Sequence, residues 1–100
     1  MLYLIHFDKP FGHARHYLGY SKDSWNLGLR IKHHRQGNGA RLMKHVSAAG
    51  IKWQVARIWQ FGSRTDERKL KQHGSVRYCP ICNPEHWYTR GNIRGVPYGD

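Results

Sequence analysis

Cysteine and acidic residues are scarce in this sequence, and long apolar runs are missing. The 100 residues include two cysteines, both in the segment Cys79-Pro80-Ile81-Cys82, so a secreted fold built on disulfides is not expected. No apolar run approaches the ~18 residues that a membrane span needs. The apolar residues 1–5 are too few for a signal peptide, and no charged residue precedes them. We therefore predict one small domain in an intracellular, cytoplasmic protein.

The scarcity of acidic residues leaves the chain strongly basic. Six Asp and Glu stand against 17 Lys and Arg, which gives a formal net charge of +11 and a pI near 10.2. Such an excess of positive charge favours binding to polyanions, of which nucleic acid is the commonest. Four Trp, six Tyr and three Phe accompany the charge, and aromatic rings can stack on bases. We therefore predict a nucleic-acid partner, with a basic protein that has no such partner as the alternative.

The order of apolar segments predicts a small α/β (α+β) domain, in which a three-stranded antiparallel sheet is flanked by helices. Pro10 and Gly12 mark a turn between the first two strands, and so short a connection favours an antiparallel hairpin. Gly50 and Gly74 are expected to end the second and third helices. The expected strands are residues 2–7, 15–20 and 51–61, and the expected helices are residues 24–35, 40–49 and 64–73.

The first helix and the C-terminal tail carry more specific expectations. Asp23 or Ser24 is expected to cap the first helix, and Trp25, Leu29 and Ile31 are expected to face the core. Residues 1–75 are expected to form the domain, and residues 76–100 form a basic, aromatic tail. This tail either packs on the domain or extends from it to contact a nucleic-acid strand by charge and stacking.

One stretch carries a set of residues that suits phosphodiester hydrolysis. Tyr17 and Gly19 close a short apolar strand, and Arg30 and His34 follow at a spacing that places them on one helical face. Glu67 is one of only two glutamates in the chain and stands within a basic segment. Such a set can activate water, neutralise a phosphate and hold a divalent metal.

This stretch resembles the GIY-YIG nuclease superfamily over residues 2–71. The second family tripeptide reads Tyr17-Leu18-Gly19, and the first reads Tyr3-Leu4-Ile5, with Tyr3 matching the tyrosine. The resemblance places the catalytic arginine at Arg30, the histidine one helical turn on at His34, and the metal-binding glutamate at Glu67. It implies a metal-dependent DNA endonuclease that uses one Mg²⁺ or Mn²⁺ ion.

Each of these residues also has an ordinary structural interpretation. Arg30 could belong to a solvated basic helix face, and Glu67 could form helix salt bridges with its basic neighbours. Tyr3 and Tyr17 could be sheet tyrosines, and His34 a surface histidine. On the functional interpretation, the general base stays open among the two tyrosines and the histidine.

The expected substrate is DNA, branched or nicked forms included, and a protein partner or a homodimer stays open. A non-catalytic nucleic-acid-binding module with the same fold is the alternative. The first tripeptide lacks its glycine and the segment before Arg30 is long for the family, and both features favour that alternative. The residues expected to contact nucleic acid are Gly19, Lys32, Arg35, Arg41, Lys44, Arg64, Arg68 and Lys71.

The C-x-x-C segment has the ligand spacing of half a zinc site. Cys79 and Cys82 would need two more ligands, for which His73 and His86 are the candidates close in sequence. Two free, buried thiols are the preferred interpretation of this pair. A zinc-dependent interaction module is the third and weakest functional hypothesis for the chain.

Overall fold

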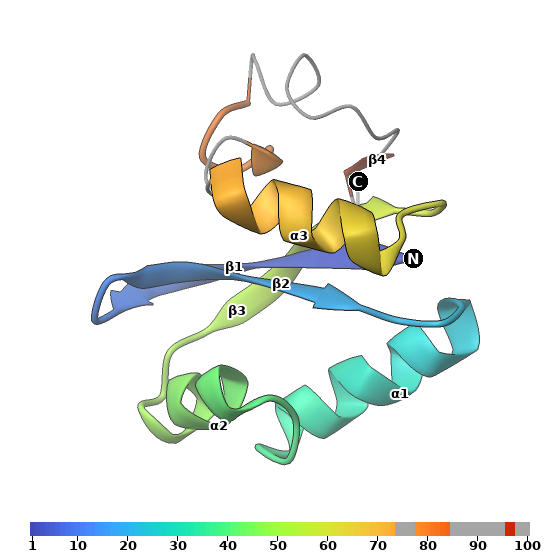
Figure 1. Cartoon of the computed structure of the whole chain (residues 1–100). Helices are drawn as coiled ribbons and strands as arrows, with labels where there is room; N and C mark the ends of the chain where they lie inside the picture. The colour runs from blue at the N-terminus through green and yellow to red at the C-terminus, as the bar shows by residue number, and fades with distance from the viewer. Residues whose placement is uncertain (74–77, 85–95, 98–100) are drawn as a thin grey trace.

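The computed structural model describes residues 1–73, 78–84 and 96–97, and it shows a β-sheet with helices on both faces (Figure 1). The sheet order is β2-β1-β3-β4, and every neighbouring pair is antiparallel. The three expected strands are present, which confirms the predicted fold class. The strands are β1 (Leu2–Phe11), β2 (Ala14–Tyr20), β3 (Trp53–Trp59) and the two-residue β4 (Val96–Pro97), which the sequence did not predict.

Helices α1 (Ser24–Arg35) and α2 (Arg41–Ala48) cover one face of the sheet, and α3 (Arg64–His73) covers the other (Figure 1). The Asp23 side chain caps α1, because it accepts a hydrogen bond of 2.8 Å from the Asn26 backbone N–H. At the start of α3, Ser63 and Asp66 each accept a hydrogen bond from the other's backbone N–H, at 3.2 and 3.0 Å. Among the described residues, no helix is long and apolar enough to cross a membrane.

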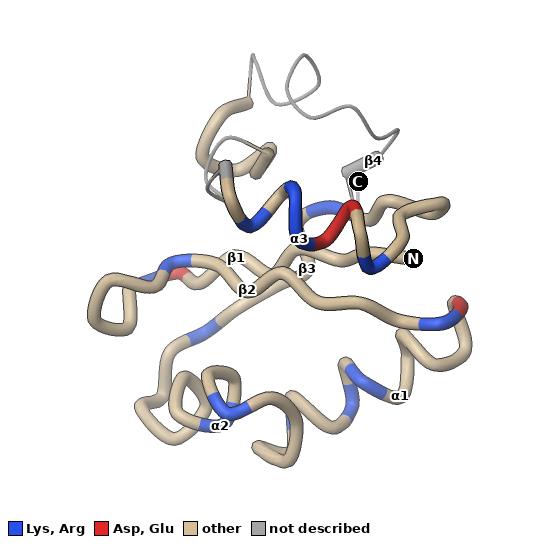
Figure 2. Tube along the Cα trace, viewed as in Figure 1, with Lys and Arg blue, Asp and Glu red and all other residues tan. Residues whose placement is uncertain are grey.

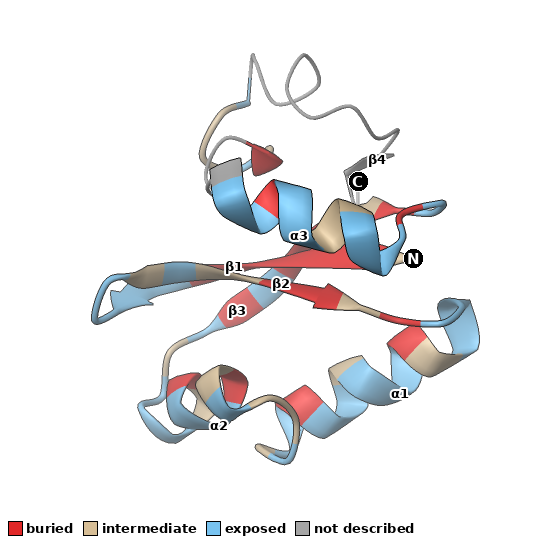
Figure 3. Ribbon diagram, viewed as in Figure 1, coloured by how far each residue is buried: buried red, intermediate tan, exposed pale blue. Residues whose placement is uncertain are grey.

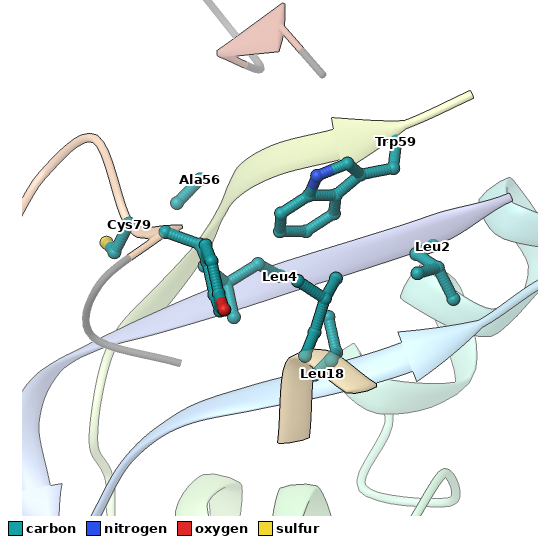
Figure 4. Packing of buried hydrophobic residues seen from close by; sticks show 8 residues of the cluster. Leu2, Leu4, Leu18, Ala56, Trp59 and Cys79 are labelled. Carbon is teal, nitrogen blue, oxygen red and sulfur yellow. The ribbon is translucent and has the colours of Figure 1, made fainter. Parts of the chain in front are cut away.

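Strand pairing sorts the side chains into two cores, one on each face. Leu4 of β1 pairs with Leu18 of β2, and both side chains lie on the α3 face, whereas Tyr3 and Ile5 point to the α1–α2 face. Figure 3 shows the buried residues along both faces of the sheet. Figure 4 shows the packing on the α3 face. That core contains Leu2, Leu4, Leu18, Ala56, Trp59, Leu70, Tyr78 and Cys79.

The prediction for the apolar face of α1 is wrong at two positions. Trp25 is 76% exposed and Leu29 is 40% exposed. The helix instead turns Leu27, Ile31 and His34 toward the sheet, and these residues are spaced i, i+4 and i+7. Residues two positions from Leu27 lie about 200° around a helix of 3.6 residues per turn, so Trp25 and Leu29 point to solvent.

The strand boundaries also differ from the prediction, most at the ends of β1 and β3. β1 continues to Phe11, and the chain reverses at Gly12, whose φ of 59° is a left-handed conformation that favours glycine. β3 ends at Trp59, and Phe61, expected within the strand, is 83% exposed. Most of the tail lies outside the described residues, so whether it packs on the domain or extends from it stays a prediction.

Leu70 anchors α3 to the sheet and is only 3% exposed, which makes it a test of this packing. We expect Leu70→Ala to lower the free energy of unfolding by about 2–5 kcal/mol, because the substitution leaves a cavity under α3. Chemical denaturation followed by circular dichroism measures this change. The exposed Leu29 provides the control, since Leu29→Ala should change stability by no more than about 0.5 kcal/mol. Equal losses in the two variants would contradict this packing of α3.

Candidate functional site

The hairpin of β1 and β2 and the helix α1 bring four of the predicted site residues together on the α1–α2 face. Tyr3 and Tyr17 come from adjacent strands, and their ring centroids are 6.1 Å apart. The His34 ring lies 6.1 Å from Tyr3 and 5.4 Å from Tyr17, centroid to centroid. Arg30 reaches the same group from one helical turn earlier, as the i, i+4 spacing in the sequence predicts.

Hydrogen bonds connect three of these side chains through the Tyr3 hydroxyl. Arg30 Nε donates to Tyr3 Oη at 3.3 Å, and Tyr3 Oη lies 3.0 Å from His34 Nε2. Because Tyr3 Oη accepts from arginine, its own hydrogen is available for the histidine nitrogen. The tyrosine therefore orients both the guanidinium and the imidazole.

The surroundings fix the charge states of this network. Burial, together with the positive charge of Arg30, lowers the pKa of His34 to about 4, so the imidazole is neutral near pH 7. Burial also raises the pKa of Tyr3 to about 12, although the hydrogen bond from Arg30 opposes this change. The same hydrogen bond raises the pKa of Arg30. At neutral pH, Tyr3 thus keeps its proton and His34 can accept a hydrogen bond from it.

Two glycines make room for the tyrosine–histidine pair. Tyr3 pairs directly with Gly19 across the strands, and a Cβ atom at Gly19 would overlap the Tyr3 ring. A Cβ atom at Gly39 would likewise overlap the His34 ring on its Nδ1 side. Gly19 was expected to contact nucleic acid, but it is buried, and the group that approaches it is the Tyr3 ring. Gly39 was missed, because its sequence context indicated only the end of a helix.

Two of the four residues in this group are buried, and the other two are partly or fully exposed. Tyr3 is 0% and His34 is 1% exposed, whereas Arg30 is exposed and Tyr17 is half-buried. A pocket of about 210 Å³ opens beside the network, and its lining includes Arg30, His34 and Asn38. A substrate in this pocket can therefore touch Arg30 directly. Tyr17 does not line the pocket but is partly exposed beside it, and the buried Tyr3 and His34 support the group from behind.

Glu67, the predicted metal ligand, is not part of this network. It lies on α3, which covers the opposite face of the sheet, and its side chain is 16% exposed. Its carboxylate Oε2 is 3.7 Å from Lys71 Nζ. The neighbouring Asp66 is engaged at the start of the helix, where its Oδ2 accepts a hydrogen bond of 3.0 Å from Ser63 Oγ. Of the two acidic residues in the first turn of α3, Asp66 takes part in capping the helix and Glu67 does not.

The basic residues predicted to contact nucleic acid are exposed on both faces of the sheet. Figure 2 shows Lys and Arg along α1 and α2 on one side and along α3 on the other. Two of these arginines also pack on aromatic rings: the guanidinium carbon of Arg35 lies 3.8 Å from the Trp53 centroid, and that of Arg64 lies 4.6 Å from the Tyr20 centroid. The exposed set is Lys32, Arg35, Arg41, Lys44, Arg64, Arg68 and Lys71.

A second group of residues, which we call the His–Cys cluster, lies on the α3 face and consists of His6, His16, Cys79 and Cys82. One ligand-type atom from each residue lies within 4.8 Å of the others. The histidines come from β1 and β2, where they are direct cross-strand partners, and both cysteines are free. The sequence suggested His73 and His86 as further ligands beside this C-x-x-C, but the His73 side chain and all of His86 lie outside the described residues.

Burial sets the protonation of the His–Cys cluster in the absence of a cation. It lowers the pKa of His6, and it lowers that of His16 to about 4. It raises the pKa of the Cys79 thiol to about 11. The two imidazoles are therefore neutral near pH 7, with one nitrogen lone pair each.

Comparisons with known proteins found no match for this chain. It matches no protein-family model, and no curated protein or solved structure shows significant similarity to it.

The spacing around Gly19 yields a test with a matched control. We expect Gly19→Ala to lower the free energy of unfolding by about 1–3 kcal/mol, because the new methyl group forces the buried Tyr3 ring to move. Gly28→Ala is the control, since nothing lies within 4 Å of its added Cβ atom and alanine favours the helix by up to about 1 kcal/mol. Thermal or urea denaturation compares the two variants. An unchanged or raised stability in Gly19→Ala would contradict the position of Tyr3.

The buried imidazole of His34 yields a prediction on pH. Its pKa is about 4 in the folded protein, against an ordinary value of about 6.5, so the unfolded chain binds more protons between these values. We therefore expect the contribution of His34 to stability to be complete above about pH 6.5 and to be lost as the pH falls toward 4. Proton NMR of the imidazole resonances measures the pKa directly.

A variant that cannot titrate controls for the other histidines. His34→Gln can still accept a hydrogen bond from Tyr3, but it should show a smaller loss of stability between pH 6.5 and 4 than the wild type does. An NMR pKa for His34 near 6.5, or the same pH dependence in both proteins, would contradict the buried, neutral imidazole.

Proposed function

We propose that this chain is a metal-dependent DNA endonuclease of the GIY-YIG type, which hydrolyses phosphodiester bonds with one Mg²⁺ or Mn²⁺ ion. The observation that carries the proposal is the hydrogen-bonded group of Tyr3, Arg30 and His34 beside Tyr17. The sequence resemblance names these same four residues. Their convergence from two strands and a helix supports a functional role beyond that of a solvated basic face.

Arg30 is the residue that binds the scissile phosphate. Its Nε contact with Tyr3 fixes the plane of the guanidinium, while the side chain remains exposed to solvent. A planar guanidinium can bind two phosphate oxygens at once and stays charged at any relevant pH. Held in this way, it stabilises the negative charge that develops on the phosphate in the transition state.

The remaining side chains divide between positioning and proton transfer. Tyr3 and His34 are buried, so they hold Arg30 in place and do not contact substrate. A Tyr3 pKa near 12 also makes this hydroxyl a poor base at neutral pH. Tyr17 is half-buried and adjoins both His34 and Tyr3, so it can relay a proton: its oxygen accepts one from the attacking water while its own hydroxyl proton passes to solvent.

Glu67 is the residue that would hold the metal ion. A carboxylate oxygen is the ligand type that Mg²⁺ prefers, and a single carboxylate suits a site completed by water and phosphate oxygens. The ion would supply charge stabilisation at the phosphate and at the leaving oxygen. The side-chain contact that Glu67 makes to the described residues is the 3.7 Å ion pair with Lys71, which leaves carboxylate oxygen available for a cation.

Sheet order offers a way to combine residues from the two faces. β2 is an outer strand of the sheet, with α1 on one side and α3 on the other. A DNA strand that crosses the β2 edge can contact Arg30 on one side and approach Glu67 on the other. Exposed Lys and Arg side chains on α1, α2 and α3 would then contact backbone phosphates on both sides of this edge (Figure 2).

A second function is favoured by the position of Glu67. Its carboxylate lies on the opposite face from Arg30 and pairs with Lys71, as in an ordinary helix salt bridge. On this alternative, the protein is a nucleic-acid-binding module that retains the fold and the basic surface without hydrolysing its ligand. Binding and cutting must therefore be measured separately.

Cleavage of labelled DNA in Mg²⁺ or Mn²⁺ tests the proposal. We expect the wild type to cut at least one member of a panel of duplex, nicked, flap and junction DNA. Arg30→Lys and Glu67→Gln should each reduce cutting by about 10²–10³-fold, because each removes stabilisation of charge in the transition state. Binding measured in Ca²⁺ or EDTA should change much less.

Matched substitutions outside the site control for the loss of charge. Arg15→Lys and Asp8→Asn alter exposed residues of the β1–β2 hairpin and should leave cutting unchanged. Cutting that survives both site substitutions would exclude this site. Tight binding of the wild type without cutting in either metal would establish the binding module instead.

A further inference from the structure

Four of the six distances within the His–Cys cluster match the edges of a tetrahedral metal site, and all four ligand-type atoms lie within 4.8 Å of one another. In a zinc site, bonds of about 2.0–2.1 Å to nitrogen and about 2.3 Å to sulfur place two nitrogen ligands about 3.3 Å apart and a nitrogen and a sulfur about 3.6 Å apart. The distance from His6 Nδ1 to His16 Nε2 is 3.3 Å. His6 Nδ1 lies 3.5 Å from Cys79 Sγ and 3.6 Å from Cys82 Sγ, and His16 Nε2 lies 3.4 Å from Cys82 Sγ. Each of these four distances is within about 0.2 Å of a tetrahedral edge.

Hydrogen bonding alone does not account for this convergence. His6 Nδ1 has three neighbours within 3.6 Å, namely His16 Nε2 and the two sulfur atoms. A ring nitrogen carries either one hydrogen or one lone pair, so it can serve one such neighbour well. Four electron-donating atoms directed at one small space are instead the arrangement that a cation stabilises.

We propose that His6, His16, Cys79 and Cys82 bind one Zn²⁺ ion in a closed, structural site. Two thiolates and two imidazoles in a tetrahedron are a ligand set that selects zinc over magnesium, which prefers six oxygen ligands. Four protein ligands leave no coordination position for water or substrate, so this zinc ion holds the fold together and takes no part in hydrolysis. The site is separate from the Mg²⁺ or Mn²⁺ ion proposed at Glu67.

The surrounding backbone already has the shape that such a site needs. The Asn83 N–H donates to the Cys79 carbonyl at 2.9 Å and closes the turn that presents both cysteines. Arg57, buried beneath this segment, donates to the Tyr78 carbonyl at 3.2 Å.

The zinc ion would join segments that are distant in sequence. His6 and His16 fix the metal to the β1–β2 hairpin, and the cysteines fix residues 78–84 to it. Because the side chains alternate along β1 and β2, the zinc lies on the α3 face, opposite Tyr3 and Tyr17. The proposed zinc ion therefore adds a cross-link to a domain whose two cores are both small.

Metal analysis of the purified protein is the first test. We expect one zinc per chain by mass spectrometry of the metal content after gel filtration in buffer free of added metal. Replacement by Co²⁺ should give the visible absorption of a tetrahedral ion and a thiolate-to-cobalt charge-transfer band. Both measurements use the wild-type chain, so they do not depend on the folding of any variant.

Substitutions then identify the ligands. Cys82→Ser and His16→Ala should each lower the zinc content to well below one per chain and lower the melting temperature. His13→Ala is the control, because His13 is an exposed histidine of the same hairpin and should retain full zinc content. Chelation of the wild-type metal should lower its melting temperature as well.

Three results would overturn the proposal. The first is a wild-type chain that holds neither zinc nor cobalt after reconstitution. The second is a disulfide between Cys79 and Cys82 that persists in a reducing buffer, and the third is full zinc content in both ligand variants. Because zinc content is measured without DNA, a failure here leaves the proposed nuclease untouched. A nuclease that fails its cleavage test likewise leaves the zinc measurement valid.

Discussion

The register of β1 with β2 is the constraint on which both groups of polar residues depend. Because side chains alternate along a strand, the pairing of Tyr3 with Gly19 sends Tyr3 toward α1, and the pairing of His6 with His16 sends both imidazoles toward α3. A shift of one residue in this register would exchange the faces and destroy both arrangements. One hairpin thus builds a hydrogen-bonded network on one side and a metal-ligand set on the other.

Burial gives the Tyr3 network its particular chemistry. In water, the tyrosine and the imidazole would exchange their partners for solvent, and neither would orient the other. Enclosed between the sheet and α1, Tyr3 keeps its proton and His34 stays neutral, so a single direction of hydrogen bonding is favoured. Arg30, at the exposed end of these hydrogen bonds, is then held by Tyr3 and His34, which solvent does not reach. On the proposed function, two buried residues would thereby affect a reaction that they do not touch.

The parts of the structure that depend on local chemistry were predictable from the sequence. Helix α1 begins after Asp23 and α3 ends at His73, as the capping residues and glycines indicated. Trp25 was assigned to the core because it is large and apolar, yet the helical phase set by Leu27 turns it outward. Tertiary packing decides which side of a helix faces the core, and a single sequence gives little information about that packing.

The candidate functional residues were likewise only partly predictable from the sequence. The resemblance assigned Tyr3, Tyr17, Arg30, His34 and Glu67 to one site, and the structure brings together all of them except Glu67, which lies on the opposite face of the sheet. The contacts of Gly39, and the meeting of His6 and His16 with the distant cysteines, depend on strand pairing and loop closure over long sequence separations. A search confined to residues near the C-x-x-C could not find those histidines.

The two proposed metal sites differ in how much negative charge the protein itself supplies. The chain carries a formal charge of +11, so a divalent cation approaches it only where negative charge is concentrated. Two cysteine thiolates balance the charge of a zinc ion completely, and the His–Cys cluster can hold it without help from a ligand outside the protein. Glu67 supplies one negative charge and stands beside Lys71, so on the proposed function DNA phosphate would provide the rest. The proposed zinc ion would then belong to the folded protein itself, whereas the proposed magnesium ion would bind only in a complex with DNA.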